Sequence, residues 1–597
     1  MAENAGIKNR SEIEDKYKWR LCDIYPNTDA WEADFKELSD CAQEIAAMKD
    51  TIAQDADSLA QGLNRLDEIS HMLEKLYVYA RMGRDMDNAD AHYQALTDRI
   101  STLAVKISAA QSFLNPLLLS LDEGVLRRWM DECGGLKEHR FFLEDLLRSK
   151  SHVLSNEEER LLSLAGDFSD GAHDIFTMLN NADLRFKDVE HDGKTYPLSH
   201  ASYIEYMQSP DRAFRKKVFE TFYEEFAEHK NTIAAAYSTS VKKDVFYARA
   251  RRFDSARQRA LFADNVDTKV YDKLIEDIHR HLPTMHKFVE LRKKLMKLDE
   301  LHMYDIYAPL VPQADVKYSY EEAVKLNLEA MKPLGEDYME VFSSAFKDGW
   351  IDVFENRGKT TGAYSWGVYG THPYVLLNHR GDLDSVFTIA HEMGHAMHTY
   401  YSNETQPYAT SGYVIFVAEV ASTVNEILMT KYLLSTVKDK NVRRYVLNHY
   451  LDQFRTTVVR QTMFAEFEKI SHEMAENGEP LTVDALSKVY GDLNALYHGP
   501  AMEKDETISL EWMRIPHFYT AFYVYKYATG LSCAVSIVKN LDKPGMLKKY
   551  RDFLRGGGSK YPLELLSDAG VSFDTCVEDC MNEFARALDE FEREMEE

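Results

Sequence analysis

Residues 381–401 read GDLDSVFTIAHEMGHAMHTYY, and the string HEMGH within this stretch begins at His391. The stretch contains no proline and predicts a helix. On a helix, residues four apart lie on one face, so His391 and His395 can bind one metal ion. Glu392 is offset from that face, which lets its carboxylate hold a water molecule beside the ion. These residues therefore predict an HExxH metal site.

A catalytic zinc ion needs a third protein ligand and an open position. The downstream segment 412–426, GYVIFVAEVASTVNE, places Glu419 within an apolar helical pattern. A buried charge is costly unless it is paired or bound to metal, so Glu419 is the predicted ligand; its alternative is a carboxylate at a helix edge. His398 is a rival ligand, but two adjacent turns of one helix cannot readily supply three ligands. The metzincin pattern is absent, because residue 401 is tyrosine.

The composition limits the possible functions. The chain has 597 residues and a formal charge of -27, so its field repels nucleic acids and anionic membranes. Its six cysteines form no CxxC pair, and the charged N-terminus MAENAGIKNRSEIEDKYKW lacks the apolar core of a secretory signal. No apolar run approaches the length of a transmembrane helix. We expect a cytoplasmic protein that binds neither nucleic acid nor membrane.

The pattern along the chain is mainly helical. Residues 27–181 follow helical periodicity, and residues 184–198 alternate around Asp192-Gly193 as a β-hairpin. Residues 350–378 are rich in glycine, aromatic and β-branched residues, which predicts short strands directly before the HExxH helix. We therefore expect a mainly α fold with a small sheet beside that helix.

Helix starts and one domain boundary can also be predicted. Residues 319–322, SYEE, have the form of a capping box, and Asp382 or Asp384 is expected to cap the HExxH helix. The hairpin suggests a division into an N-terminal helical domain, 1–198, and a catalytic domain, 199–597.

Residues 516–527, PHFYTAFYVYKY, are a candidate source of hydrogen-bond donors for an oxyanion. Tyr523 and Tyr527 are one helical turn apart, with His517 nearby. An aromatic stripe at helical spacing is more often core packing, so the pattern alone leaves both interpretations open.

The sequence resembles the M3 zinc metallopeptidases, and within them the oligoendopeptidase F group. The resemblance covers most of the chain and is carried by KWRLCDIYPNTDAW (18–31), TGAYSWG (361–367), PYVLLN (373–378), TIAHEMGHAMH (388–398), FVAEVAST (416–423), RIPHFYTAFYVYKYATG (514–530) and FLRGGGSKYPLELL (553–566).

The resemblance implies a site and a fold. It implies one catalytic Zn²⁺ held by His391, His395 and Glu419, Glu392 as the catalytic acid and base, and His517, Tyr523 and Tyr527 facing the substrate or its oxyanion. Tyr525 competes with these two tyrosines as a substrate-binding residue.

The implied fold has two helical lobes that enclose a deep channel. Residues 373–378, with Tyr374, Val375 and Leu376, would form an edge strand that pairs with the peptide; a buried strand is the alternative.

The function that follows is zinc-dependent endopeptidase activity on short peptides, with direct attack by water. Alternatives are a zinc carboxypeptidase or aminopeptidase, and a non-catalytic helical peptide-binding protein with structural zinc. Cleavage preference, substrate length and oligomeric state do not follow from the sequence.

Two other sequence motifs resemble binding sites but do not match the required patterns. Residues 555–560, RGGGSK, resemble a phosphate-binding loop but lack GxxxxGK[ST] spacing, so we expect a flexible turn near the channel. Cys576 and Cys580 are one turn apart without a partner cluster, which favours two buried thiols over a second metal site.

Overall fold

The chain folds into two units, each built from three separate stretches, in a computed structural model that describes residues 7–311 and 316–596. Unit 1 comprises Met1–Ser151, Val316–Tyr432 and Asn540–Gly570, and unit 2 comprises His152–Asp315, Leu433–Lys539 and Val571–Glu597. The predicted domains are continuous, whereas these units are interleaved along the chain. Turn signals mark where a helix ends, but not which later helix returns to pack on it.

The secondary structure is mainly helical, as predicted. The helices lying wholly or mostly in unit 1 are α1 (Thr28–Met48), α2 (Ala56–Met86), α3 (Ala91–Gln111), α4 (Leu114–Ser120), α5 (Glu123–Glu132), α6 (Arg140–Ser149), α13 (Tyr320–Ala330), α14 (Glu336–Ala345), α15 (Leu383–Thr405), α16 (Tyr408–Ser411), α17 (Ile415–Thr436), α22 (Met546–Leu554) and α23 (Pro562–Asp568). Those of unit 2 are α7 (Asn156–Ser169), α8 (Gly171–Met178), α9 (His200–Tyr206), α10 (Arg212–Ala250), α11 (Ala256–Phe262), α12 (Thr268–Met296), α18 (Lys440–Gln453), α19 (Arg460–Glu476), α20 (Val483–His498), α21 (Tyr525–Asn540) and α24 (Cys576–Glu596). None of the described helices is both long and apolar enough to cross a membrane.

Unit 2 contains the predicted hairpin. Strands β1 (Val189–His191) and β2 (Lys194–Tyr196) pair antiparallel. Asp192 and Gly193 have φ values of 47° and 74°, the positive angles that a tight two-residue hairpin turn requires. The prediction is therefore confirmed.

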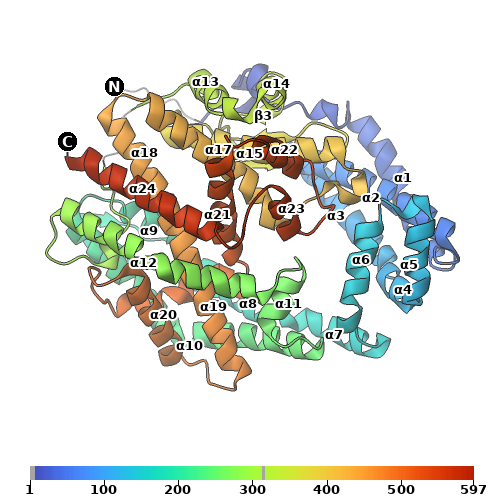
Figure 1. Cartoon of the computed structure of the whole chain (residues 1–597), viewed down its shortest axis with the longest axis horizontal. Helices are drawn as coiled ribbons and strands as arrows, with labels where there is room; N and C mark the ends of the chain where they lie inside the picture. The colour runs from blue at the N-terminus through green and yellow to red at the C-terminus, as the bar shows by residue number, and fades with distance from the viewer. Residues whose placement is uncertain (1–6, 312–315, 597) are drawn as a thin grey trace. The chain divides into compact units, whose positions relative to one another are not determined.

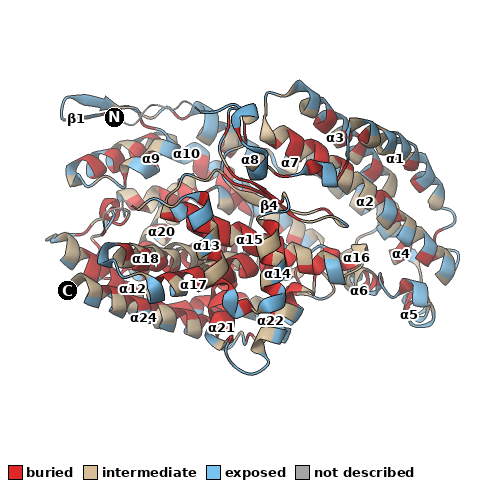
Figure 2. Ribbon diagram, turned by 90° about the horizontal axis from the view of Figure 1, so that it is seen from above, coloured by how far each residue is buried: buried red, intermediate tan, exposed pale blue. Residues whose placement is uncertain are grey.

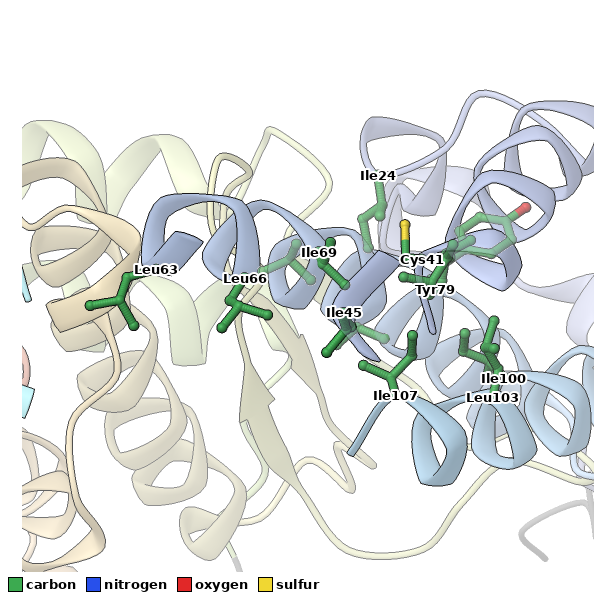
Figure 3. Packing of buried hydrophobic residues seen from close by; sticks show 14 of the residues in the cluster. Ile24, Cys41, Ile45, Leu63, Leu66, Ile69, Tyr79, Ile100, Leu103 and Ile107 are labelled. Atoms are coloured by element: carbon green, nitrogen blue, oxygen red, sulfur yellow. The ribbon is translucent and has the colours of Figure 1, made fainter. Parts of the chain in front are cut away.

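The N-terminal helices of unit 1 pack around one apolar core. Helix α2 buries Leu66, Ile69, Leu76 and Ala80 in this core, and the partly buried Leu73 packs against it. Figure 3 shows Ile69 among side chains of α1 and α3. The Trp31 indole also donates a hydrogen bond to the Leu76 carbonyl at 2.9 Å. This core includes side chains from the small sheet, which joins the sheet to the helices.

The three-stranded sheet of unit 1 has the order β3-β5-β4. Strand β5 (Tyr374–Leu376) pairs in parallel with β3 (Ile351–Asp352) and antiparallel with β4 (Tyr364–Trp366). The short strands joined by glycine turns were predicted correctly.

The predicted edge position of residues 373–378 is wrong, because β5 is the central strand. The Val375 N–H donates to the Trp350 carbonyl at 2.8 Å, on the β3 side, and β4 occupies the other side. Tyr374, Val375 and Leu376 are fully buried. A continuous apolar run is typical of a strand covered on both faces. The two edge strands of the sheet are β3 and β4.

We predict that Ile69→Ala lowers the free energy of unfolding of unit 1 by about 2–5 kcal/mol, because it leaves a cavity at a fully buried site. Urea unfolding followed by circular dichroism would measure the change. Val105→Ala on α3 is the control, since Val105 is 70 % exposed and its loss should cost less than about 0.5 kcal/mol. Equal effects of the two substitutions would contradict the assigned core.

Candidate metal centre

Helix α15 presents the HExxH residues as predicted. The Asp382 side chain accepts a hydrogen bond from the Ser385 N–H at 2.9 Å. Of the two predicted caps, Asp382 and Asp384, it is therefore Asp382 that caps the helix. Buried residues run along most of α15 (Figure 2), which fixes its rotation about its axis. The two imidazoles consequently converge, with the His391 and His395 Nε2 atoms 3.2 Å apart.

Helix α17 brings Glu419 to the same point. Its Oε2 atom lies 3.6 Å from His391 Nε2 and 3.7 Å from His395 Nε2. Bonds of about 2.0–2.1 Å in a tetrahedral zinc site separate the ligand atoms by roughly 3.3 Å. The three residues therefore fit one tetrahedral ion, and they are brought together as a possible metal-binding group.

Gly394 allows the two helices to approach this closely. A Cβ atom at Gly394 would lie 2.5 Å from the Ser422 Cα and 2.8 Å from the Ala421 carbonyl oxygen. These are backbone atoms, which cannot turn away as a flexible side chain can. The Asn425 side chain also joins the helices, donating to the Ala390 carbonyl at 3.1 Å. The glycine inside HEMGH is thus a packing requirement of the site.

Hydrogen bonds orient both imidazoles. The His391 Nδ1–H donates to Glu426 Oε1 at 2.9 Å, and the ring of His395 donates to the backbone carbonyl of Ala418. Such partners fix the ring orientation and leave Nε2 free to bind a metal. Glu426 is not among the residues predicted from the sequence. Its signal was available, because it follows Glu419 by seven residues, two turns further along α17 and on the same face.

The protonation states follow from burial and charge. Burial alone would lower the pKa of His391, but the hydrogen bond that its ring donates to Glu426 and the nearby carboxylates raise the pKa to about 9. Burial lowers the pKa of His395 to about 3, aided by the charge of His391. Burial also raises the pKa of Glu392 to about 7, where a carboxyl group can both accept and return a proton near neutral pH.

Glu392 lies between α15 and the free edge of the sheet. Its carboxylate accepts a hydrogen bond from the backbone N–H of Ser365 on β4. Ser365 is paired with Val375 in the ladder, and the Val375 N–H points toward β3. Ser365 and Val375 therefore form a non-hydrogen-bonded pair, in which each residue directs its N–H and C=O groups away from the other strand. The free edge of β4 is therefore next to the HExxH residues.

His398 does not join the converging ligand atoms. Its buried ring stacks on Tyr413 with centroids 3.8 Å apart, and Phe553 lies on it at 5.2 Å. Burial lowers the pKa of His398 to about 3, so the ring is neutral. It is a packing residue rather than a ligand or a surface residue.

The aromatic candidates form a second cluster, in unit 2. The ring centroids of His517 and Tyr523 are 6.2 Å apart, those of His517 and Tyr527 are 6.0 Å apart, and the tyrosines are 5.5 Å from each other. All three side chains are half-buried. Burial and the charge of Arg460 lower the pKa of His517, which favours its neutral form. The three residues are thus brought together as predicted, while their role stays a prediction.

Tyr525 does not suit the predicted substrate-binding role. It is 1 % exposed, and its ring packs on Tyr271 with centroids 5.2 Å apart. Helix α21 begins at Tyr525, so Tyr523 lies in the preceding turn and not on the helix. Tyr523 and Tyr527 are therefore not one turn apart on a single helix, as the sequence pattern had predicted, although their rings are in contact.

A buried carboxyl group holds this turn and was missed by sequence analysis. Glu468 on α19 is fully buried, and its Oε1 accepts a hydrogen bond from the Phe522 N–H at 3.0 Å. Phe522 has a φ of 58°, a conformation rare for a bulky residue. Burial raises the pKa of Glu468 far above its usual value, which favours the protonated form. Strained residues held in this way often adjoin functional groups.

No cysteine belongs to a group that could hold a metal ion in the described part of the chain. Cys576 and Cys580 are buried and free, as predicted.

Comparison with known proteins identifies the family. A model of peptidase family M3 matches residues 205–581, and a model of oligopeptidase F matches residues 118–186. Oligopeptidase PepF of Bacillus subtilis is 42 % identical over 591 residues, covering 98 % of this chain and 88 % of that protein. An oligoendopeptidase F homolog of Lactococcus lactis is 39 % identical, covering 99 % of both chains.

Solved structures agree. A peptidase from Chlamydophila abortus superposes with a TM-score of 0.92 at 33 % identity, covering 99 % of this chain and 100 % of that one. Oligoendopeptidase-F from Enterococcus faecium gives 0.74 at 36 % identity, covering 95 % and 99 %. The chain is therefore a metallopeptidase that cleaves oligopeptides. It belongs to peptidase family M3, in the oligoendopeptidase F group.

We predict that Glu426→Gln weakens Zn²⁺ binding to the metal-free protein about 10–100-fold, because the His391 ring loses its charged partner. Competition with a chelator of known affinity would measure the dissociation constant. Glu404→Gln at the exposed end of α15 is the control and should leave binding unchanged. Equal affinities of the two variants would show that Glu426 does not support the site.

Proposed function

We propose that this metallopeptidase is a zinc-dependent endopeptidase that hydrolyses internal bonds of short peptides. The observation that carries the proposal is the convergence of His391, His395 and Glu419 beside the buried carboxyl group of Glu392. Structural zinc sites are closed by four protein ligands, whereas catalytic sites keep one position open. Within the described residues three ligand atoms converge here, and their side chains remain 16–36 % exposed. This favours catalytic over structural zinc.

The donor set suits zinc. Two imidazole nitrogens and one carboxylate oxygen, at the spacing described above, match a common catalytic zinc site. When bound there, zinc would lower the pKa of water and polarise the carbonyl of the scissile peptide bond.

Glu392 would move the proton. We assign it to accept a proton from the attacking water and to donate it to the leaving amine. Its raised pKa, about 7, suits both steps. The Ser365 N–H would hold the carboxylate in place, and no side chain would form a covalent intermediate.

The free edge of β4 would bind the substrate backbone. An extended peptide can add to an exposed sheet edge through main-chain hydrogen bonds, which do not depend on the peptide's side chains. Ser365 directs its backbone groups to this edge, one hydrogen bond away from Glu392. This assignment replaces the central strand β5.

His517, Tyr523 and Tyr527 would contribute donors to the peptide or to the oxyanion. A neutral imidazole and two phenol groups can all donate hydrogen bonds without a charge. Their mutual contacts and partial exposure support this role.

We predict that Glu392→Gln lowers kcat about 10²–10⁴-fold while one Zn²⁺ per chain is retained, because the proton carrier is lost and the ligands are not. Activity would be measured on an internally quenched peptide blocked at both ends, and zinc by elemental analysis. Glu404→Gln is again the control. Unchanged turnover in Glu392→Gln would contradict the mechanism.

The blocked peptide also separates endopeptidases from exopeptidases. An endopeptidase cuts it, whereas a carboxypeptidase or aminopeptidase needs a free terminus. If the wild-type protein cleaves only the unblocked peptide, the exopeptidase alternative is correct.

A further inference from the structure

The link between α15 and α17 determines where the third metal ligand lies. Residues 406–414 join the two helices and contain only the short helix α16. Glu419 is the fifth residue of α17, which begins at Ile415. A shift of this connector would therefore move the Glu419 carboxylate relative to the two histidines.

The glycine turn 556–558 lies against this connector, all within unit 1. The Gly558 N–H donates to the Thr410 carbonyl at 2.8 Å. The Arg555 carbonyl accepts hydrogen bonds from Gln406 Nε2 at 2.7 Å and from Thr405 Oγ1 at 2.9 Å. Hydrogen bonds thus join the turn both to the end of α15 and to the middle of the connector.

The contact is too close for any side chain. A Cβ atom at Gly558 would lie 2.2 Å from the Gly412 carbonyl oxygen. One at Gly557 would lie 2.3 Å from the Thr410 carbonyl oxygen and 2.6 Å from the Ser402 hydroxyl. Gly557 also has a φ of 52°, which favours glycine. Two of these three atoms belong to the connector backbone, so a methyl group here would push the connector itself.

The turn is itself fixed in place. The Gly556 N–H donates to the Phe553 carbonyl at 3.0 Å, and the Ser559 hydroxyl donates to the Gly556 carbonyl at 2.6 Å. Lys560 pairs with Asp568 at 2.6 Å. Helix α22, which precedes the turn, packs on α15, as the red and yellow helices in Figure 1 show. The flexible turn expected from the sequence is thus well bonded, and its Gly556 and Gly558 N–H groups are not available to a phosphate.

We propose that the glycine turn 556–558 is a positioning element for the metal centre, which presses the connector 406–414 against α15 and so sets the place of Glu419. The inference rests on the zinc site of the proposed function. The turn touches neither metal nor substrate, and acts through the connector.

The test is Zn²⁺ affinity, measured by chelator competition on the metal-free full-length chain. Gly558→Ala should weaken Zn²⁺ binding at least tenfold, since the methyl group displaces the Gly412 carbonyl. Gly412→Ala is the matched control. It adds the same methyl group to the connector, but nothing lies within 4 Å and its φ of -73° suits alanine. Its affinity should equal that of the wild type.

A milder variant covers the case in which Gly558→Ala does not fold. Gln406→Met keeps the side-chain length but removes the hydrogen bond to Arg555 and the one that Gln406 Oε1 accepts from Thr410 Oγ1. It should weaken Zn²⁺ binding about 2–10-fold with a nearly unchanged melting temperature of the metal-free protein. Wild-type affinity in folded Gly558→Ala, or in Gln406→Met where only that variant folds, would overturn the proposal. Failure of the wild type to bind Zn²⁺ would instead refute the proposed function.

Discussion

The backbone contact between α15 and α17 at Gly394 is the constraint on which the metal centre depends. A side chain at this position would meet the Ser422 Cα at 2.5 Å, so only glycine lets the helices approach this closely. At that separation the carboxylate of Glu419 lies 3.6–3.7 Å from the Nε2 atoms of His391 and His395. Asn425 joins the same pair of helices at another point, and the glycine turn 556–558 is bonded to the connector between them. The ligand geometry is therefore a consequence of helix packing, which carries most of the precision that a metal site needs.

Burial and hydrogen bonding then give the side chains different tasks. His391 is tied to a carboxylate and His395 to a backbone carbonyl, so both rings are oriented before any ion binds. Glu392 is offset from the ligands, in a buried position that raises its pKa to about 7. Its carboxylate accepts a hydrogen bond from the Ser365 N–H, which places this proposed proton carrier next to the edge of β4 that has no partner strand within the described sheet. The candidate metal ligands, the proposed base and the proposed peptide-binding edge thus lie on adjoining elements of unit 1.

Much of this arrangement could be predicted from local sequence, and the errors have physical causes. HExxH and the isolated charge of Glu419 are local signals, and so are the Asp192-Gly193 turn and the Asp382 cap. Strand order is not local: an apolar run such as Tyr374–Leu376 suits a central strand, and its partners lie at residues 351–352 and 364–366. Tyr525 was predicted to bind substrate but is buried, because the position at which α21 begins decides which tyrosines face inward. Glu426 and the glycine turn act through tertiary contacts, which a single sequence does not display.

X-ray absorption at the zinc edge, on protein loaded with one equivalent of Zn²⁺, would identify the atoms that bind the ion. We expect only nitrogen and oxygen neighbours, in four- or five-fold coordination, with the multiple-scattering signature of two imidazoles. The His395→Ala variant should lose one of these two imidazoles. Sulfur neighbours, or a spectrum without imidazole scattering, would place the ion elsewhere and contradict the assignment of His391, His395 and Glu419.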